Sequence, residues 1–303
     1  MLVAPLPYNG VIVGVLKVVS PWVNAYSAND VHTLELLNTL IGAAIAHAAQ
    51  HARTEAETNA AAASNAFAIE AQREHIARII AAKDFRIAFQ PIVALRDARV
   101  VGYEALARFP GGRSPNEWFD DASHVGLGPE LELTVARECL ASLGRIPDDA
   151  YMAVNVSPEA MQRDELEALC LRHDPHRIVL EITEHTYIED YDALMESTKR
   201  LKRLGVRFAI DDAGAGFASL RHVLRIRPDL IKLDGSITRN IDRESAHQSL
   251  ASALLIFAQG TAAAIVAEGI ETEAEASTLR QLGVAFGQGY FLGVPGALPA
   301  TLT

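Results

Sequence analysis

The chain is predicted to be an α/β protein whose main part is a TIM-like (β/α)₈ barrel. From residue 84 onward, short apolar and β-branched runs alternate with helical stretches, the pattern of strands joined by helices. Six consecutive runs end in a polar residue that can bind a metal or move a proton. In such a barrel the C-terminal ends of the strands meet on one face, so these residues are expected to share one site. The runs end at Glu104, Asn155, Glu181, Asp211 with Asp212, Lys232 and Glu268.

Bulk composition limits the class of protein. A length of 303 residues suffices for one barrel of about 250 residues and a smaller element. The net charge of −11 argues against nucleic-acid polymers and anionic membranes as partners. No run reaches the roughly 20 apolar residues that span a bilayer, and no signal peptide is seen. The two cysteines show no metal-ligand spacing and are expected to be buried free thiols. Free thiols fit a reducing compartment, so we expect a cytoplasmic chain.

The N-terminal segment is predicted to form a small α+β element. Residues 1–26 are typical of a β-hairpin, because Asn9-Gly10 is a strong two-residue turn signal between apolar runs. Asn29-Asp30 is expected to cap the helix that follows. A single hairpin and helix bury little core, so this segment is part of a domain or is completed by pairing.

Residues 47–82 are rich in Ala, Glu, Arg and Gln and lack proline and glycine. This composition favours one continuous helix. Its apolar seam is weak, so a solvated linker and a two-stranded coiled coil remain equally compatible with it.

The barrel strands follow in order. The link between the first two, near residues 96–99, is too short for a parallel crossover, so these two strands are expected to be antiparallel. Helices are expected between the later strands, for example at Asp190–Leu204 and Ala246–Gln259. The predicted strands are Ile87–Leu95, Val100–Phe109, Tyr151–Val156, Arg177–Ile182, Val206–Asp211, Leu230–Asp234, Ala264–Glu268 and Ala285–Leu292.

The polar strand ends indicate a two-metal site. Glu104, Asn155, Glu181 and Asp211 offer hard oxygen ligands, which suit Mg²⁺ or Mn²⁺ better than zinc. Asp211 and Asp212 are adjacent and reach one site only where the strand ends. One of them then bridges two cations, an arrangement suited to phosphodiester hydrolysis.

Lys232 is the only basic group among these ends and should stay protonated between carboxylates. It is expected to position the attacking water or neutralise charge, with Glu268 as the alternative base; a purely structural ion pair is the competing interpretation. Asp234 lies on the same strand face and is expected to tether Lys232. Glu184 and Glu271 are expected to anchor loops behind the ligands.

Residues 84–296 resemble the EAL domain, a bacterial phosphodiesterase that linearises cyclic di-GMP. The resemblance covers the whole barrel in order. Its motifs are FQPIV at 89–93, YEALARF at 103–109, NVSP at 155–158, LEITE at 180–184, DDAGAGFASL at 211–220, IKLD at 231–234, AEGIET at 267–272 and QGYF at 288–291.

The resemblance implies roles for particular residues. Lys232 and Glu268 match the proposed water-activating pair, and Gln288 matches a glutamine that supports the water network. The implied product is linear 5′-pGpG. The implied metal ligands are Glu104, Asn155, Glu181, Asp211, Asp212 and Glu268, and the implied contacts to the dinucleotide are Gln90, Leu106 and Arg108.

One loop departs from the family pattern. The usual Asp-Asp-Phe-Gly-Thr-Gly-Tyr reads Asp-Asp-Ala-Gly-Ala-Gly-Phe here, with Ala213, Ala215 and Phe217 at the changed positions. In the family this loop couples dimerisation to metal binding. Every charged group is retained, so activity is expected.

Residues 1–50 resemble the C-terminal part of a GAF sensory domain, judged from APLPYNGVIVGVLKV and the helix after it. The predicted organisation is a partial GAF-like domain at 1–50, a helical linker at 51–82 and an EAL barrel at 83–303. The N-terminal part is expected to act as a dimerising element, which makes a homodimer the expected assembly.

Two other functions remain as alternatives to a cyclic di-GMP phosphodiesterase. A receptor would bind cyclic di-GMP without cutting it, but retention of all the implied ligands favours the enzyme. A barrel metalloenzyme acting on another phosphate or on an enolisable acid explains the strand-end carboxylates but not the ordered motifs.

Overall fold

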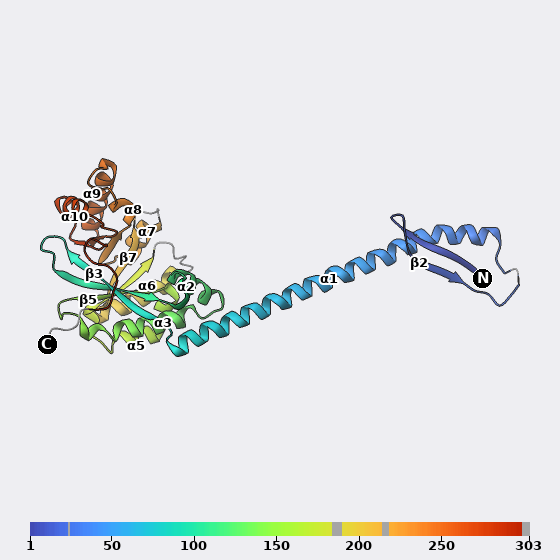
Figure 1. Cartoon of the computed structure of the whole chain (residues 1–303), viewed down its shortest axis with the longest axis horizontal. Coiled ribbons are helices and arrows are strands. Elements are labelled where there is room, and N and C mark those ends of the chain that lie inside the picture. The colour runs from blue at the N-terminus through green and yellow to red at the C-terminus, as the bar shows by residue number, and fades with distance from the viewer. Residues whose placement is uncertain (24, 184–189, 214–217, 299–303) are drawn as a thin grey trace. The chain divides into compact units, whose positions relative to one another are not determined.

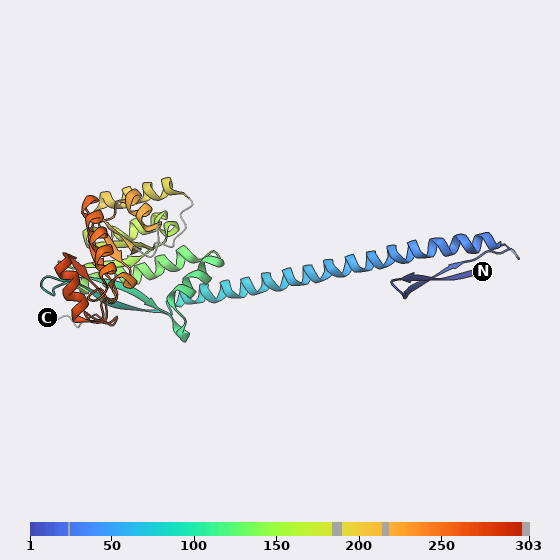
Figure 2. The same cartoon turned by 90° about the horizontal axis from the view of Figure 1, so that it is seen from above.

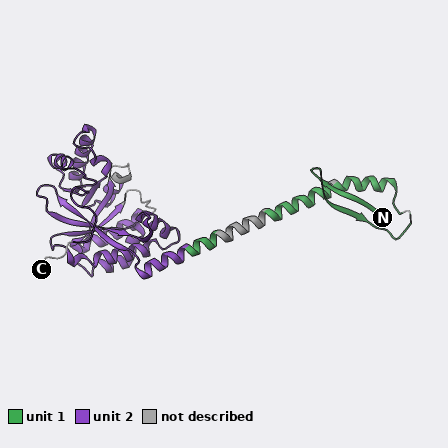
Figure 3. Ribbon diagram, in the orientation of Figure 1, with its two compact units in different colours: residues 1–71 green, residues 72–303 purple. Residues whose placement is uncertain are grey.

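The computed structural model describes residues 1–23, 25–183, 190–213 and 218–298. Two compact units make up the chain, residues 1–71 and residues 72–303 (Figure 3). The division falls within the long helix α1 (Ala28–Ala82), so the last turns of this helix belong to the second unit. No helix among the described residues is long and apolar enough to cross a membrane.

The first unit contains the predicted hairpin. Strands β1 (Leu2–Tyr8) and β2 (Val11–Val18) pair antiparallel. Asn9 and Gly10 both have positive φ, 49° and 80°, which is the backbone conformation that the Asn-Gly turn supplies. The hairpin turn is therefore confirmed.

The start of α1 differs from the expected cap. The helix begins one residue after Ser27, whose hydroxyl accepts from the Asp30 N–H at 3.4 Å. In return the Ser27 N–H donates to the Asp30 carboxylate at 2.7 Å. This reciprocal pair caps the helix, so the prediction that Asn29-Asp30 would cap it was wrong: Asp30 is the partner of the cap.

The second unit is the predicted barrel, seen in two directions in Figures 1 and 2. The strands close in the order β10-β3-β4-β5-β6-β7-β8-β9. As expected, the first of them, β3, is antiparallel to β4; it is antiparallel to β10 as well, and the other pairs are parallel. The strands are β3 (Arg86–Ala94), β4 (Val100–Arg108), β5 (Tyr151–Asn155), β6 (Ile178–Thr183), β7 (Arg207–Ala213), β8 (Leu230–Leu233), β9 (Ala264–Ala267) and β10 (Phe286–Gly287).

Seven predicted strands agree with the structure to within two residues at either end, but the last is far shorter than Ala285–Leu292. β10 stops at Gly287, two residues before Gly289. A Cβ at Gly289 would lie 2.2 Å from the backbone of Ile270, so the two segments cross at contact distance where the strand ends.

Helices cover the outside of the barrel. They include the two helices predicted between later strands, α6 and α9. The helices of the second unit are α2 (Pro115–His124), α3 (Gly128–Leu140), α4 (Pro158–Met161), α5 (Asp164–Cys170), α6 (Tyr191–Leu204), α7 (Ala218–Ile226), α8 (Gly235–Thr238), α9 (Ser245–Gly260) and α10 (Glu273–Leu282), with 3₁₀ turns at Pro110–Gly112, Leu143–Arg145 and Pro175–Arg177.

The barrel interior away from the polar strand-end residues is an apolar core. Side chains of all eight strands pack there, among them Ile92, Tyr151, Ala209 and Val266. This packing leaves the C-terminal ends of the strands as the place where polar side chains are brought together.

Candidate functional site

The predicted polar residues converge at the C-terminal ends of the barrel strands. Most of their side chains are buried, while Asn155, Asp212 and Glu268 are half-buried. Each comes from a different strand or from the residue directly after it, except for the adjacent pair on β7. The residues are Glu104 on β4, Asn155 on β5, Glu181 on β6, Asp211 and Asp212 on β7, Lys232 on β8, Glu268 after β9 and Gln288 after β10.

Lys232 lies at the centre of this cluster and is only 1% exposed. Its Nζ lies 2.8 Å from Glu181, 2.8 Å from Glu268, 3.0 Å from Asp211 and 3.4 Å from Glu104. Burial alone would lower the pKa of Lys232, but the four carboxylates outweigh it and hold the pKa well above its usual value. Lys232 therefore stays protonated and donates hydrogen bonds.

A bulge in β7 lets both aspartates serve the site. The register with β8 shifts between Ile210 and Ala213, and Asp212 has a φ of +57°. In a regular strand neighbouring side chains point to opposite faces. The left-handed backbone at Asp212 removes that alternation, so its carboxylate lies near that of Asp211.

Two groups of carboxylates are close enough to hold a cation each. In one group, oxygens of Glu104, Glu181 and Asp211 lie within 4.8 Å of one another. In the other, oxygens of Asp211, Asp212 and Glu268 meet the same limit. Asp211 belongs to both groups, as expected for a carboxylate that bridges two metal ions.

The charges of the cluster require compensation. The cluster holds five carboxylates, and among the described residues of the cluster Lys232 is the one ammonium group, which pairs with four of them. Burial raises the pKa of Glu181 well above its usual value and that of Glu268 to about 8. Divalent cations would keep these groups ionised, so the oxygen donors and their surplus charge fit Mg²⁺ or Mn²⁺.

Gln288 and Gln90 form a buried pair beside the cluster. The Gln288 amide donates to Glu104 at 2.6 Å and to Gln90 at 2.9 Å. Gln90 in turn donates to the backbone oxygen of Gly293 at 3.1 Å. These bonds fix one oxygen of the Glu104 carboxylate, and the Asn155 amide donates to the other oxygen at 3.2 Å.

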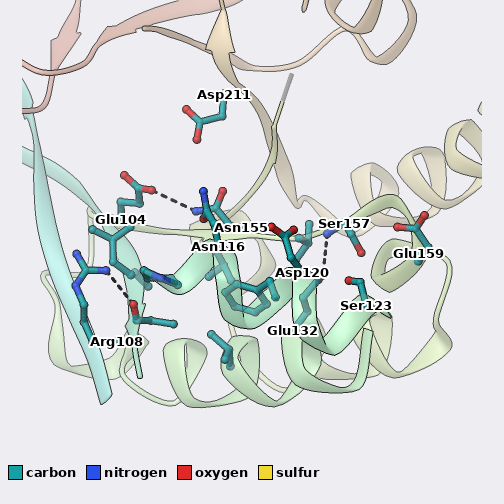
Figure 4. Close-up of a pocket in the computed structure, with 18 of the residues that line it drawn as sticks. Glu104, Arg108, Asn116, Asp120, Ser123, Glu132, Asn155, Ser157, Glu159 and Asp211 are labelled. Carbon is teal, nitrogen blue, oxygen red and sulfur yellow. Dashed lines mark hydrogen bonds between the residues drawn. The ribbon is translucent and has the colours of Figure 1, made fainter. Parts of the chain in front are cut away.

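A pocket of about 690 Å³ opens beside the cluster (Figure 4). Glu104, Asn155 and Asp211 line one part of it, and the predicted substrate contacts Leu106 and Arg108 also line it. Gln90 is not among its lining residues. The pocket therefore joins the acidic cluster to a space large enough for a small molecule.

Sequence reasoning missed one wall of this pocket. Asn116, Asp120 and Ser123 on α2 are exposed polar residues of a surface-type helix and gave no signal. Glu132 on α3 was missed as well, because Glu130 and Arg137 lie on the same helix and Glu132 did not stand out as a lone charge. It accepts from the Ser157 N–H at 2.6 Å, and burial raises its pKa above the usual value.

The three residues expected behind the ligands have different outcomes. Asp234 accepts from the Ser236 N–H at 2.9 Å and caps α8. Both Asp234 and Lys232 are described, and the ion pairs of Lys232 do not include Asp234, so the expectation that Asp234 tethers Lys232 was wrong. Glu271 pairs with Arg239 at 2.8 Å on the surface. Glu184 lies outside the described residues, as do positions 214–217 of the altered loop and the side chain of Ala213.

Comparison with known proteins gives a consistent result. A profile of the EAL domain family matches residues 71–295. A signaling protein of Caulobacter vibrioides is 34% identical over 233 residues, covering 73% of this chain and 29% of that protein. The bifunctional diguanylate cyclase/cyclic di-GMP phosphodiesterase MucR of Pseudomonas aeruginosa is 30% identical over 221 residues, covering 68% of this chain and 32% of MucR. The chain spans less than a third of the length of these and similar curated relatives.

Solved structures resemble the barrel unit. The PaMucR phosphodiesterase in complex with cyclic di-GMP has a TM-score of 0.65 and 29% identity, covering 74% of this chain and 97% of that one. A manganese and cyclic di-GMP complex of Klebsiella pneumoniae BlrP1 has a TM-score of 0.61 and 30% identity, covering 70% of this chain and 56% of that one.

Proposed function

Because the chain belongs to the EAL domain family, we propose that it hydrolyses one phosphodiester bond of cyclic di-GMP with the help of two divalent cations, giving linear 5′-pGpG. The observation that carries the proposal is the pair of carboxylate groups sharing Asp211 around Lys232, beside a pocket of about 690 Å³. Relatives named as cyclic di-GMP phosphodiesterases support the choice of substrate.

The proposed ligands of the two cations are Glu104, Asn155, Glu181, Asp211, Asp212 and Glu268. Bound Mg²⁺ or Mn²⁺ would polarise the phosphate group and lower the pKa of water. In this scheme the Lys232 ammonium, held by four carboxylates, orients the attacking water by donating to its oxygen. Glu268, 2.8 Å from Lys232, takes up the proton that the water loses.

The remaining proposed roles concern binding and support. Arg108 lines the pocket, and its guanidinium suits a phosphate oxygen of the dinucleotide. Gln288 fixes Glu104 and with it the water network. Asp234 and Glu271, through α8 and the loop after β9, hold the segments behind Lys232 and Glu268.

We also propose that the protein works as a cytoplasmic homodimer, with residues 1–50 as a GAF-like element, 51–82 as a linker and 83–303 as the catalytic barrel. The N-terminal unit supports the dimer, because Val13 and Val15 on β2 and Leu36 and Leu40 on α1 are exposed apolar side chains.

The alternative is a receptor that binds cyclic di-GMP without cutting it. Its support is the altered loop, where Ala213, Ala215 and Phe217 replace an aromatic ring, a hydroxyl and a phenol. The complete set of carboxylates and Lys232 argues for the enzyme.

One experiment separates the two functions. The purified 303-residue chain is incubated with cyclic di-GMP and Mg²⁺ or Mn²⁺, with an EDTA control, and the products are separated by chromatography. Metal-dependent 5′-pGpG is the expected result. Glu104→Ala should lose this product, whereas Glu165→Ala, which removes an exposed carboxylate on α5, should retain it. Saturable binding without product would establish the receptor instead.

A further inference from the structure

Helix α2 separates the pocket from the last turns of α1. Five of its residues line the pocket, and their spacing of one, three and four residues places them on one face of the helix. Three of them, Asn116, Asp120 and Ser123, are labelled in Figure 4. Trp118 lies on an adjacent face and is only 4% exposed.

Trp118 contacts the chain on both sides of α2. Its ring stacks on Phe109, with 5.3 Å between centroids and 21° between planes. Phe109 directly follows Arg108 and also packs edge-on against Phe119, which lines the pocket. The indole therefore supports the position of Arg108 through the backbone and that of Phe119 through a shared ring contact.

The last turns of α1 hold α2 from outside. Ile76 and Ile79 are buried, so this end of α1 is part of the barrel unit. The His75 ring lies 5.5 Å from the ring of Trp118, and Arg73 donates to the backbone oxygen of Val125, the residue that ends α2.

The contacts of Trp118 depend on ring shape. Its indole N–H is buried and finds no hydrogen-bond partner among the described residues. A phenylalanine would keep an aromatic ring for the stacking and lack this unpaired group, at the loss of the second indole ring and part of the contact with the Arg113 guanidinium, 5.2 Å from the ring centroid. The position can therefore be tested with a conservative replacement.

We propose that Trp118 is a positioning residue that ties the α2 wall of the substrate pocket to the last turns of α1. A displacement at the end of α1 then changes how tightly the substrate is held, while the metal cluster on the strand ends keeps its geometry. This inference rests on the proposed function, because it concerns the affinity of the same site for cyclic di-GMP.

The first test measures KM and kcat separately in the whole 303-residue chain. Trp118→Ala should raise KM about tenfold or more and leave kcat within about twofold. The loss of one aromatic contact weakens binding about two- to tenfold, and this change removes more than one such contact. Trp118→Phe should restore KM. His75→Ala should raise KM about threefold, whereas Glu74→Ala, an exposed neighbour on α1, should not.

The outcomes are distinct. Unchanged KM in Trp118→Ala and His75→Ala, or a fall in kcat alone, overturns the inference while leaving the proposed function intact. If wild-type protein neither cuts nor binds cyclic di-GMP, both fail. Should Trp118→Ala not fold, as shown by a lost melting transition, His75→Ala and Arg73→Ala decide.

A second test has a readout other than activity. The chain has two tryptophans, so Trp22→Phe leaves Trp118 as the only indole fluorophore. Cyclic di-GMP added in Ca²⁺ should change the Trp118 emission with the same Kd that calorimetry gives. Unchanged emission despite calorimetric binding would show that the α2 wall does not report on the pocket, and would overturn the inference.

Discussion

The two units of this chain differ in which side chains they bury and which they expose. The barrel unit buries charges at its centre, with Lys232 and Glu181 each 1% exposed. The N-terminal unit leaves apolar groups on its surface, with Trp22 79% exposed and Leu40 70% exposed.

The difference follows from how many elements surround each region. Around the barrel centre, strands on all sides satisfy the backbone and exclude water, so buried charges interact strongly with one another. One hairpin and one helix cannot enclose their own apolar side chains, since only a few residues such as Leu6 and Leu34 become buried. A charged centre is thus a product of an enclosing fold, and changes to it should have far larger effects than changes to the N-terminal surface.

The largest expected effect is on turnover in Glu104→Ala. This change removes one of the carboxylates around Asp211 and the acceptor of Gln288. Mutation of residues that hydrogen-bond to metal ligands already lowers activity or metal affinity about 10- to 100-fold. Loss of a ligand itself should therefore reduce kcat by more than about 100-fold. Turnover is measured by chromatography and the fold by melting temperature. Wild-type turnover in this variant would refute the metal assignment.

Calcium should inhibit strongly. A larger ion with looser geometry does not hold water and phosphate in line as Mg²⁺ or Mn²⁺ does. With saturating Ca²⁺ in place of Mg²⁺, we expect binding of cyclic di-GMP by calorimetry but little 5′-pGpG. Full activity in Ca²⁺ would contradict the two-metal scheme.

Lys232→Met should destabilise the metal-free protein. Removing one partner of a buried ion cluster typically costs about 3–5 kcal/mol, because the remaining charges are left uncompensated. Urea unfolding in EDTA measures this loss. The matched variant Lys199→Met, at an exposed pair with Glu196, should cost less than about 1 kcal/mol. Equal losses of stability in the two variants would show that the buried cluster contributes no more to stability than an exposed ion pair does.

Metal-free stability should fall as pH rises from about 5 to 8. Burial raises the folded-state pKa of Glu268 to about 8, above its usual value of 4.5. The protonated Glu268 carboxyl therefore contributes to the free energy of unfolding in full below pH 4.5. This stabilisation is lost as pH rises through 8. Cations hold the ionised form, so the melting-temperature gain from Mg²⁺ should be larger at pH 8 than at pH 6. A gain independent of pH would contradict this account.

The smallest effect on catalysis should come from the N-terminal surface. Val15→Asp places a charge on an exposed apolar position of β2. It should leave kcat and KM per protomer unchanged and shift the protein toward the monomer in analytical ultracentrifugation. Asn29→Asp adds the same charge at an exposed polar position and should not shift it. A dimer unaffected by Val15→Asp would place the interface elsewhere.

Local patterns in the sequence were enough to predict the strands and the residues at their ends. Asn9-Gly10 determined a turn that needs two positive φ angles, and β-branched runs determined seven barrel strands to within two residues. Glu104, Lys232 and the other strand-end residues were identified because the ends of barrel strands always meet on one face.

The tertiary structure alone decided how those residues contact one another. The sharing of Asp211 depends on a bulge at Asp212, and the four ion pairs of Lys232 depend on how the strands are staggered when the barrel closes. The α2 wall, the buried Glu132 and the end of the last strand at Gly287 likewise had to be seen in the structure. The physical reason is range: turn and strand preferences are local along the chain, whereas distances between strand ends depend on closure of the whole barrel.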